Sequence, residues 1–89
     1  MKKIVDYRII AQKDNLDNIF FEIRTVYYNK NGKPDRYDVD ASVVFGYDIE
    51  DLMFTVNEFK RALNMPILWG DDKFPKEFDY DEWVKNKKL

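Results

Sequence analysis

The chain has 89 residues and a mass of 10.8 kDa, which leaves room for one hydrophobic core. It contains neither Cys nor His, which excludes disulfide scaffolds, thiolate chemistry, imidazole acid–base catalysis and the usual zinc ligand sets. A net charge of −2 supplies no basic field for nucleic acid, whereas aromatic residues make up 17% of the chain and call for an explanation.

The first two predicted elements are β-strands joined by a polar turn. Residues 4–12 alternate with a period of two, and residues 19–28 are rich in β-branched and aromatic side chains. One face of this strand pair is more apolar than the other, and we expect it to face the core. It holds Val5, Tyr7, Ile9 and Ala11 from the first strand and Ile19, Phe21, Ile23, Thr25 and Tyr27 from the second.

A hairpin is predicted between the second strand and a third strand at about 36–45. A two-residue turn would set the apolar face of one strand against the polar face of the other. A three-residue loop at 30–32, closed by Asn29 and Lys33 with Gly32 at positive φ, avoids this. In that register the apolar face continues across the third strand, where it holds Tyr37, Val39, Ala41, Val43 and Phe45.

A helix is predicted next, with Asp48 as its N-cap, and it ends before Pro66. Phe54 lies on the side opposite the apolar stripe, between Glu58 and Arg61, so an exposed Phe there needs a partner. The stripe itself spans roughly 80° of the helix and is expected to pack on the sheet; it consists of Ile49, Leu52, Val56, Phe59 and Leu63.

The remaining residues form a C-terminal extension that is unusually aromatic. Residues 66–69 are extended and apolar, and residues 70–72 form a turn. Asp79 and Glu82 have the spacing of a capping box, which predicts a short helix to about Lys87. Five aromatic residues lie here: Trp69, Phe74, Phe78, Tyr80 and Trp83.

Together these elements predict an α+β fold in a single domain, 1–89. Its core, 4–64, is a three-stranded antiparallel meander with one α-helix packed on its inner face. Residues 65–89 form the aromatic C-terminal extension with a short helix. No stretch approaches the roughly 18 apolar residues of a membrane span, so a cytoplasmic location is expected.

The composition disfavours an enzyme. Without His or Cys, a general base would be a carboxylate, a Lys or a Tyr in an apolar pocket, yet the acidic residues cluster in turns and at helix starts. No phosphate-binding or nucleophile motif is present. We therefore expect a non-enzymatic protein with no cofactor and no metal.

Protein recognition is the favoured function, because aromatic residues with charged neighbours are typical of binding hot spots. An inhibitor of a host protein, encoded by a phage or mobile element, is the sharper version of this hypothesis. The aromatic extension could instead cover the bare sheet face, or a homodimer could bury the outer sheet faces. The predicted partner-binding residues are Phe54, Glu58, Arg61, Phe20, Tyr28, Trp69, Phe78 and Trp83.

The alternative functions are single-stranded nucleic-acid binding and a homodimeric structural protein. Basic and aromatic residues near the hairpin tip could gather on the outer sheet face, as in sheets on which bases stack. This set comprises Arg24, Tyr28, Lys30, Lys33 and Arg36.

The order of hairpin, third strand and D-x-x-x-L helix over residues 4–64 resembles the β-β-β-α module of HicB-type antitoxins. The chain is more similar to small bacterial and phage proteins with no known activity. The motifs shared with them are Tyr27-Tyr28, Asn31-Gly32-Lys33-Pro34, Asp48-Ile49-Glu50-Asp51-Leu52 and Pro66-Ile67-Leu68. The resemblance implies a fold and carries no activity.

Overall fold

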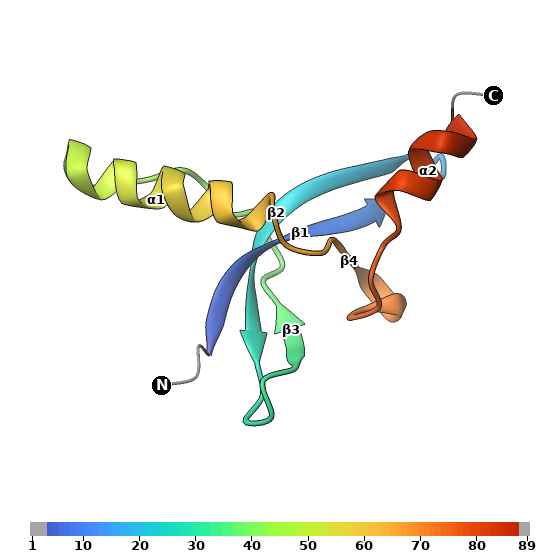
Figure 1. The fold of residues 1–89 in the computed structure, drawn as a ribbon, viewed down its shortest axis with the longest axis horizontal. Coiled ribbons are helices and arrows are strands. Elements are labelled where there is room, and N and C mark those ends of the chain that lie inside the picture. Colours follow the sequence, from blue (N-terminus) through green and yellow to red (C-terminus); the bar gives the residue numbers. More distant parts are fainter. Residues whose placement is uncertain (1–3, 88–89) are drawn as a thin grey trace.

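Residues 4–87 are described by a computed structural model, shown in Figure 1. In chain order the elements are β1 (Val5–Lys13), β2 (Ile19–Tyr28), β3 (Pro34–Tyr37), α1 (Ile49–Ala62), β4 (Leu68–Trp69), a 3-10 turn η1 (Asp71–Lys73) and α2 (Tyr80–Lys87). The predicted α+β class is confirmed, as is the short helix of the C-terminal extension. No helix between residues 4 and 87 has the length and hydrophobicity needed to cross a lipid bilayer.

The sheet has four strands in the order β3-β2-β1-β4. The predicted antiparallel pairing of the first three strands is present, but the prediction missed the fourth strand, β4, at the free edge of β1. β1 and β2 pair antiparallel from Lys13↔Ile19 to Val5↔Tyr27, as expected of strands joined by a short turn. β4 runs parallel to β1, with Ile10 opposite Leu68. It is parallel because the chain crosses over through α1 before returning to the free edge of β1.

The hairpin between β2 and β3 has the predicted three-residue loop. The Asn29 N–H donates to the Lys33 carbonyl at 2.8 Å, and Gly32 has φ +79°. Beyond the loop, a bulge shifts the pairing by one residue, so that Tyr37 lies opposite Val26 rather than opposite Thr25. The prediction that Tyr37 shares the face of Thr25 is therefore wrong, because one extra residue turns every later side chain to the other face.

The third strand is much shorter than the predicted 36–45. After Tyr37, the carbonyls of Asp38 and Val39 accept hydrogen bonds from the Arg24 guanidinium, and residues 39–41 leave the ladder. The backbone returns to β2 only where the Ser42 N–H donates to the Ile23 carbonyl at 2.8 Å. A side chain thus takes the carbonyls that ladder pairing would have used.

The best-buried core lies on the sheet face that the sequence pattern predicts to be the outer one. Ile10 and Val26 are fully buried there against Leu68. The C-terminal extension covers this face: Phe74 packs against Tyr37 at 4.9 Å between ring centroids. A homodimer through this outer face is thereby disfavoured, because the same chain already occupies it.

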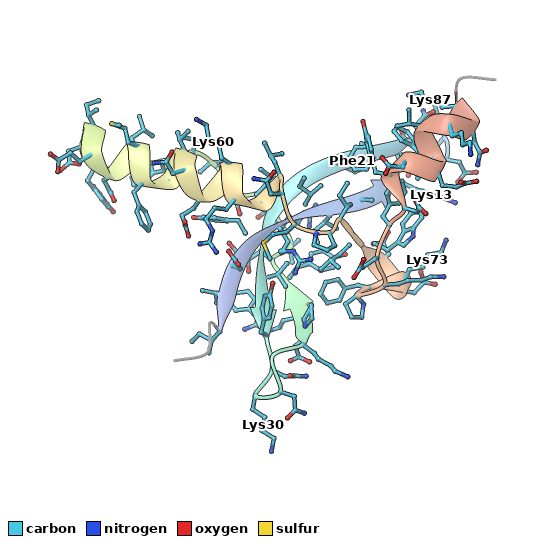
Figure 2. All side chains as sticks on the ribbon, viewed as in Figure 1. Lys13, Phe21, Lys30, Lys60, Lys73 and Lys87 are labelled. Carbon is cyan, nitrogen blue, oxygen red and sulfur yellow. The ribbon has the colours of Figure 1, made fainter. Side chains whose placement is uncertain are left out.

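The opposite face is covered at one end by α2 and at the other by the end of α1. Phe21, labelled in Figure 2, contacts Phe78 and Trp83 edge to face at 5.5 and 5.3 Å. At the other end, Tyr7 contacts Phe59 at 4.8 Å. The C-terminal extension therefore packs on both faces of the sheet.

Helix α1 begins as predicted, with the Asp48 carboxylate accepting from the Asp51 N–H at 2.8 Å. It does not lie on the sheet: only its C-terminal end reaches β1, and the rest extends away from the body of the molecule (Figure 1). Ile49 and Leu63 of the predicted buried stripe are 71% and 64% exposed, and Phe45, also assigned to the core, is 54% exposed. The predicted packing is found toward the C-terminal end of the stripe, where Phe59 contacts Tyr7, but not at Ile49 and Leu63, because the C-terminal extension takes up much of the sheet surface.

Candidate protein-binding surface

The most unusual feature of the molecule is an arm that carries exposed apolar side chains. We call residues 39–63 the apolar arm; it consists of α1 and the extended segment that leads into it. Of the fourteen large hydrophobic residues that are exposed among the described residues, ten belong to it. They are Val39, Val43, Val44, Phe45, Tyr47, Ile49, Met53, Phe54, Val56 and Leu63.

Local hydrogen bonds give the tip of the arm a defined structure. The Thr55 hydroxyl donates to the Phe45 carbonyl at 2.9 Å, and the Tyr47 N–H donates to the Asp51 carboxylate at 3.1 Å. A Cβ at Gly46 would lie 2.6 Å from the Cα of Leu52, so the extended segment approaches the helix more closely than a side chain allows. The exposed side chains are therefore held on an ordered support.

Helix α1 turns one side toward its own chain and leaves another bare. Ala62 is buried, while Leu52 and Phe59 are half-buried on the same side. The bare side carries residues spaced alternately four and three apart, which we call the exposed seam. It consists of Ile49, Met53, Val56, Lys60 and Leu63. Figure 2 shows Lys60 pointing out from α1, away from the sheet.

The arm gives the chain more surface than a folded monomer of its size normally has. The accessible surface is 6957 Å², whereas a monomer of 10.8 kDa typically exposes about 5,500 Å². The radius of gyration is 14.3 Å, against about 12 Å for a compact domain of this length. The excess surface is therefore roughly 1,400 Å², more than the about 800 Å² that each partner buries in a standard interface.

Three of the predicted partner-binding residues lie together on the arm. Phe54 is 65% exposed, as predicted. Beside it, Arg61 forms an ion pair with Glu58 at 3.2 Å. This cluster faces away from the exposed seam.

The other five predicted partner-binding residues lie in the body, and none of them is fully exposed. Phe78 is only 8% exposed, and its ring packs edge to face against Trp69 at 4.8 Å. Trp83 is half-buried against Phe21. The sequence predicts all three as surface contacts; the structure places them in the packing of the extension against the sheet.

Phe20 and Tyr28 are half-buried on the sheet. The Tyr28 hydroxyl accepts a hydrogen bond of 2.7 Å from the guanidinium of the buried Arg8. Its ring also packs against the buried core. Tyr28 therefore has a structural role in this chain.

The five residues of the nucleic-acid hypothesis are not brought onto one face. Arg24 is engaged by Glu22 at 2.8 Å, and Arg36 lies over the Tyr27 ring on the opposite sheet face, 3.8 Å from its centroid. A hydrogen bond to the Asp38 carboxylate raises the pKa of the Tyr27 phenol. Lys30 and Lys33 are exposed at the hairpin tip, where Figure 2 labels Lys30.

An open groove of about 720 Å³ lies where the arm joins the body. Three carboxylates on its wall give it an acidic character. Its lining residues are Leu63, Asn64, Met65, Pro66, Ile67, Glu77, Phe78, Asp79, Tyr80 and Asp81. Within residues 4–87, no group of three or more potential ligand side chains is arranged to hold a metal ion.

Comparison with protein-family models, with curated proteins and with solved structures returns no match. The functional conclusion therefore depends on the apolar arm and its surroundings.

Proposed function

We propose that this chain is a non-catalytic protein-binding module that binds its partner through the apolar arm. The observation that carries the proposal is the concentration of exposed large hydrophobic residues on one projecting, ordered element. Large exposed apolar patches on soluble proteins mark interaction surfaces.

The chemistry of the arm suits a protein partner better than a small molecule. Phe45, Tyr47 and Phe54 offer large aromatic contact surfaces at little entropic cost, since each has few rotatable bonds. The Glu58–Arg61 ion pair and the acidic first turn of α1 add charges around these anchors. An apolar centre with a charged rim is the usual anatomy of a protein interface.

The experiment is affinity capture with the tagged 89-residue chain, followed by calorimetric titration of the purified partner. Tyr47→Ala and Phe54→Ala are expected to weaken binding roughly tenfold or more in combination, because each removes a large exposed ring.

Leu16→Ala is the matched control, because Leu16 is 82% exposed in the turn between β1 and β2, outside the arm. It should bind as the wild type does. Wild-type affinity in the double variant, or an equal loss in the control, would contradict the proposed role of the arm.

A further inference from the structure

We infer that the apolar arm docks onto a second copy of the same chain, with the two α1 helices antiparallel along their exposed seams. This inference rests on the proposed function, because it assigns a second copy to one side of the same arm, the exposed seam, and leaves the side that carries Phe54 to the partner titrated above.

The first step is the spacing of the exposed seam. Ile49, Met53, Val56, Lys60 and Leu63 follow the alternating four and three intervals by which a helix presents one line of side chains to another helix. The 14 residues of α1 extend over about 21 Å, or two heptads. Four of the five positions are apolar, and those four are between 37% and 71% exposed.

The second step is self-complementarity about Val56. In an antiparallel pair with its two-fold axis at this residue, Ile49 of one copy lies opposite Leu63 of the other. Val56 meets Val56 on the axis, and Met53 comes next to Lys60 of the second copy, along whose methylene stem it can pack. Such an isologous contact closes a dimer and stops there.

The third step is charge. The first turn of α1 carries Glu50 and Asp51, whereas its last turn carries Lys60 and Arg61. Antiparallel docking brings Glu50 of one copy near Lys60 of the other and opposes the two helix dipoles favourably. Parallel docking would instead put Lys60 against Lys60 within the seam.

The fourth step is space. Because α1 extends away from the sheet (Figure 1), antiparallel docking leaves the two bodies at opposite ends of the helix pair. Parallel docking would crowd both bodies at the same end. The whole chain exposes roughly 1,400 Å² more than a compact monomer of its mass, against the about 800 Å² that each copy buries in a standard interface.

The first experiment measures the mass of the full chain in solution by sedimentation across the micromolar range. A dimer of twice 10.8 kDa is expected. Val56→Asp should weaken dimerisation roughly 100-fold or more, since it sets two carboxylates against each other on the two-fold axis. The control is Phe54→Asp, the same change on the opposite side of α1, which should leave the dimer intact.

A charge exchange tests the same pairing without removing an apolar side chain. Lys60→Glu should weaken the dimer, because it places a carboxylate near Glu50 of the second copy. Adding Glu50→Lys should restore it. Loss in the double variant equal to that in Lys60→Glu would overturn the pairing of these two positions.

Disulfide trapping determines the orientation, and the absence of Cys from the chain removes any background. Under oxidation, a mixture of Ile49→Cys and Leu63→Cys chains should give the crosslinked mixed dimer. Crosslinking of Ile49→Cys chains to themselves as the main product would overturn the antiparallel arrangement.

The outcomes also separate this inference from the proposed function. A wild-type chain that stays monomeric throughout the range overturns the inference alone, and the titration with Tyr47→Ala and Phe54→Ala then still tests the arm. Suppose instead that Phe54→Asp breaks the dimer and Val56→Asp leaves it intact. This result would overturn docking through the exposed seam, but the arm would still be the binding surface.

Discussion

Arg24 determines where β3 ends. Its guanidinium forms an ion pair with Glu22 at 2.8 Å and donates to the Asp38 carbonyl at 2.9 Å, and its side chain is only 11% exposed. Charge-assisted hydrogen bonds in such a setting are stronger than neutral ones. A single side chain thus takes two backbone carbonyls, those of Asp38 and Val39, at the point where residues 39–41 leave the sheet.

Replacing this side chain should therefore cost more than replacing an exposed arginine. Arg24→Ala is expected to lower the free energy of unfolding by about 2–3 kcal/mol, because it leaves backbone carbonyls and Glu22 without their donor. Urea denaturation measures the change.

Arg36→Ala is the comparison, since Arg36 is exposed and stacks on Tyr27. It should cost about 0.5–1 kcal/mol, the usual range for an exposed cation–π contact. Equal losses in the two variants would contradict the role assigned to Arg24.

Among the elements, the turn between β1 and β2 is organised by one carboxylate. Asp14 accepts hydrogen bonds from the N–H groups of Leu16 and Asn18 at 2.8 and 2.9 Å. The bond from the Asn18 backbone is the main reason that the pKa of Asp14 lies below its ordinary value of 3.8. The turn also holds Asp17 at φ 63°, in the left-handed region.

The lowered pKa has a consequence for stability in acid. Below 3.8 the unfolded chain binds a proton at Asp14 before the folded chain does, so the contribution of this group is present above that pH and is lost as pH falls through the folded pKa. Asp14→Asn should therefore unfold with a weaker dependence on pH in this range. Parallel urea titrations at a series of acidic pH values test this, and identical pH dependence in the two proteins would contradict it.

Elements with strong local signals are the ones that the sequence predicts well. The Asn29–Lys33 closure, the Asp48 cap and the Asp79 cap of α2, which accepts from the Glu82 N–H at 3.0 Å, each depend on a few neighbouring residues. β4 could not be predicted, because a strand of two residues shows no periodicity. The length of β3 could not be predicted either, because the donor that competes with the backbone N–H groups for its carbonyls is Arg24, which is distant in sequence.

Alternation along a strand identifies which residues share a face, but not which face is covered. Arg8 makes its face of β1 look polar, yet that face holds the fully buried Ile10. Its two terminal guanidinium nitrogens donate there to the Tyr28 hydroxyl and to the Pro66 carbonyl, at 2.7 and 2.8 Å. Both partners come from distant parts of the chain, which sequence spacing does not reveal.

At the scale of the whole molecule, the C-terminal extension is part of the core. Phe78 is 8% exposed and joins Trp69, Phe21 and Trp83 in one aromatic cluster. Phe78→Ala should lower the free energy of unfolding by about 3–5 kcal/mol, a large share of the 5–15 kcal/mol typical of a domain. Thermal or urea unfolding measures it.

Phe54→Ala serves as the control for this substitution, because Phe54 is exposed on the arm and faces away from the seam. Its effect should stay within about 0.5 kcal/mol. A small effect of Phe78→Ala would mean that the extension is not needed to hold the sheet together.

The sequence predicts only part of the candidate binding surface on the arm. Phe54 is identified by its place opposite the predicted stripe, and it is exposed as expected. The sequence does not reveal the exposed seam. Leu52 and Phe59 broaden the apolar face of α1, and the pattern therefore predicts that the whole face packs on the sheet. Only the fold reveals that much of the sheet is already covered, and that the seam is left bare.

Because of where the two tryptophans lie, fluorescence and circular dichroism report on different parts of the molecule. Trp69 and Trp83 both belong to the C-terminal extension, and the arm contains no tryptophan. Intrinsic fluorescence therefore reports whether the extension is docked, whereas far-ultraviolet circular dichroism is dominated by the longer helix, α1. If the arm melts before the body, the two unfolding curves will not coincide, and raising the protein concentration should bring them together by stabilising the dimer.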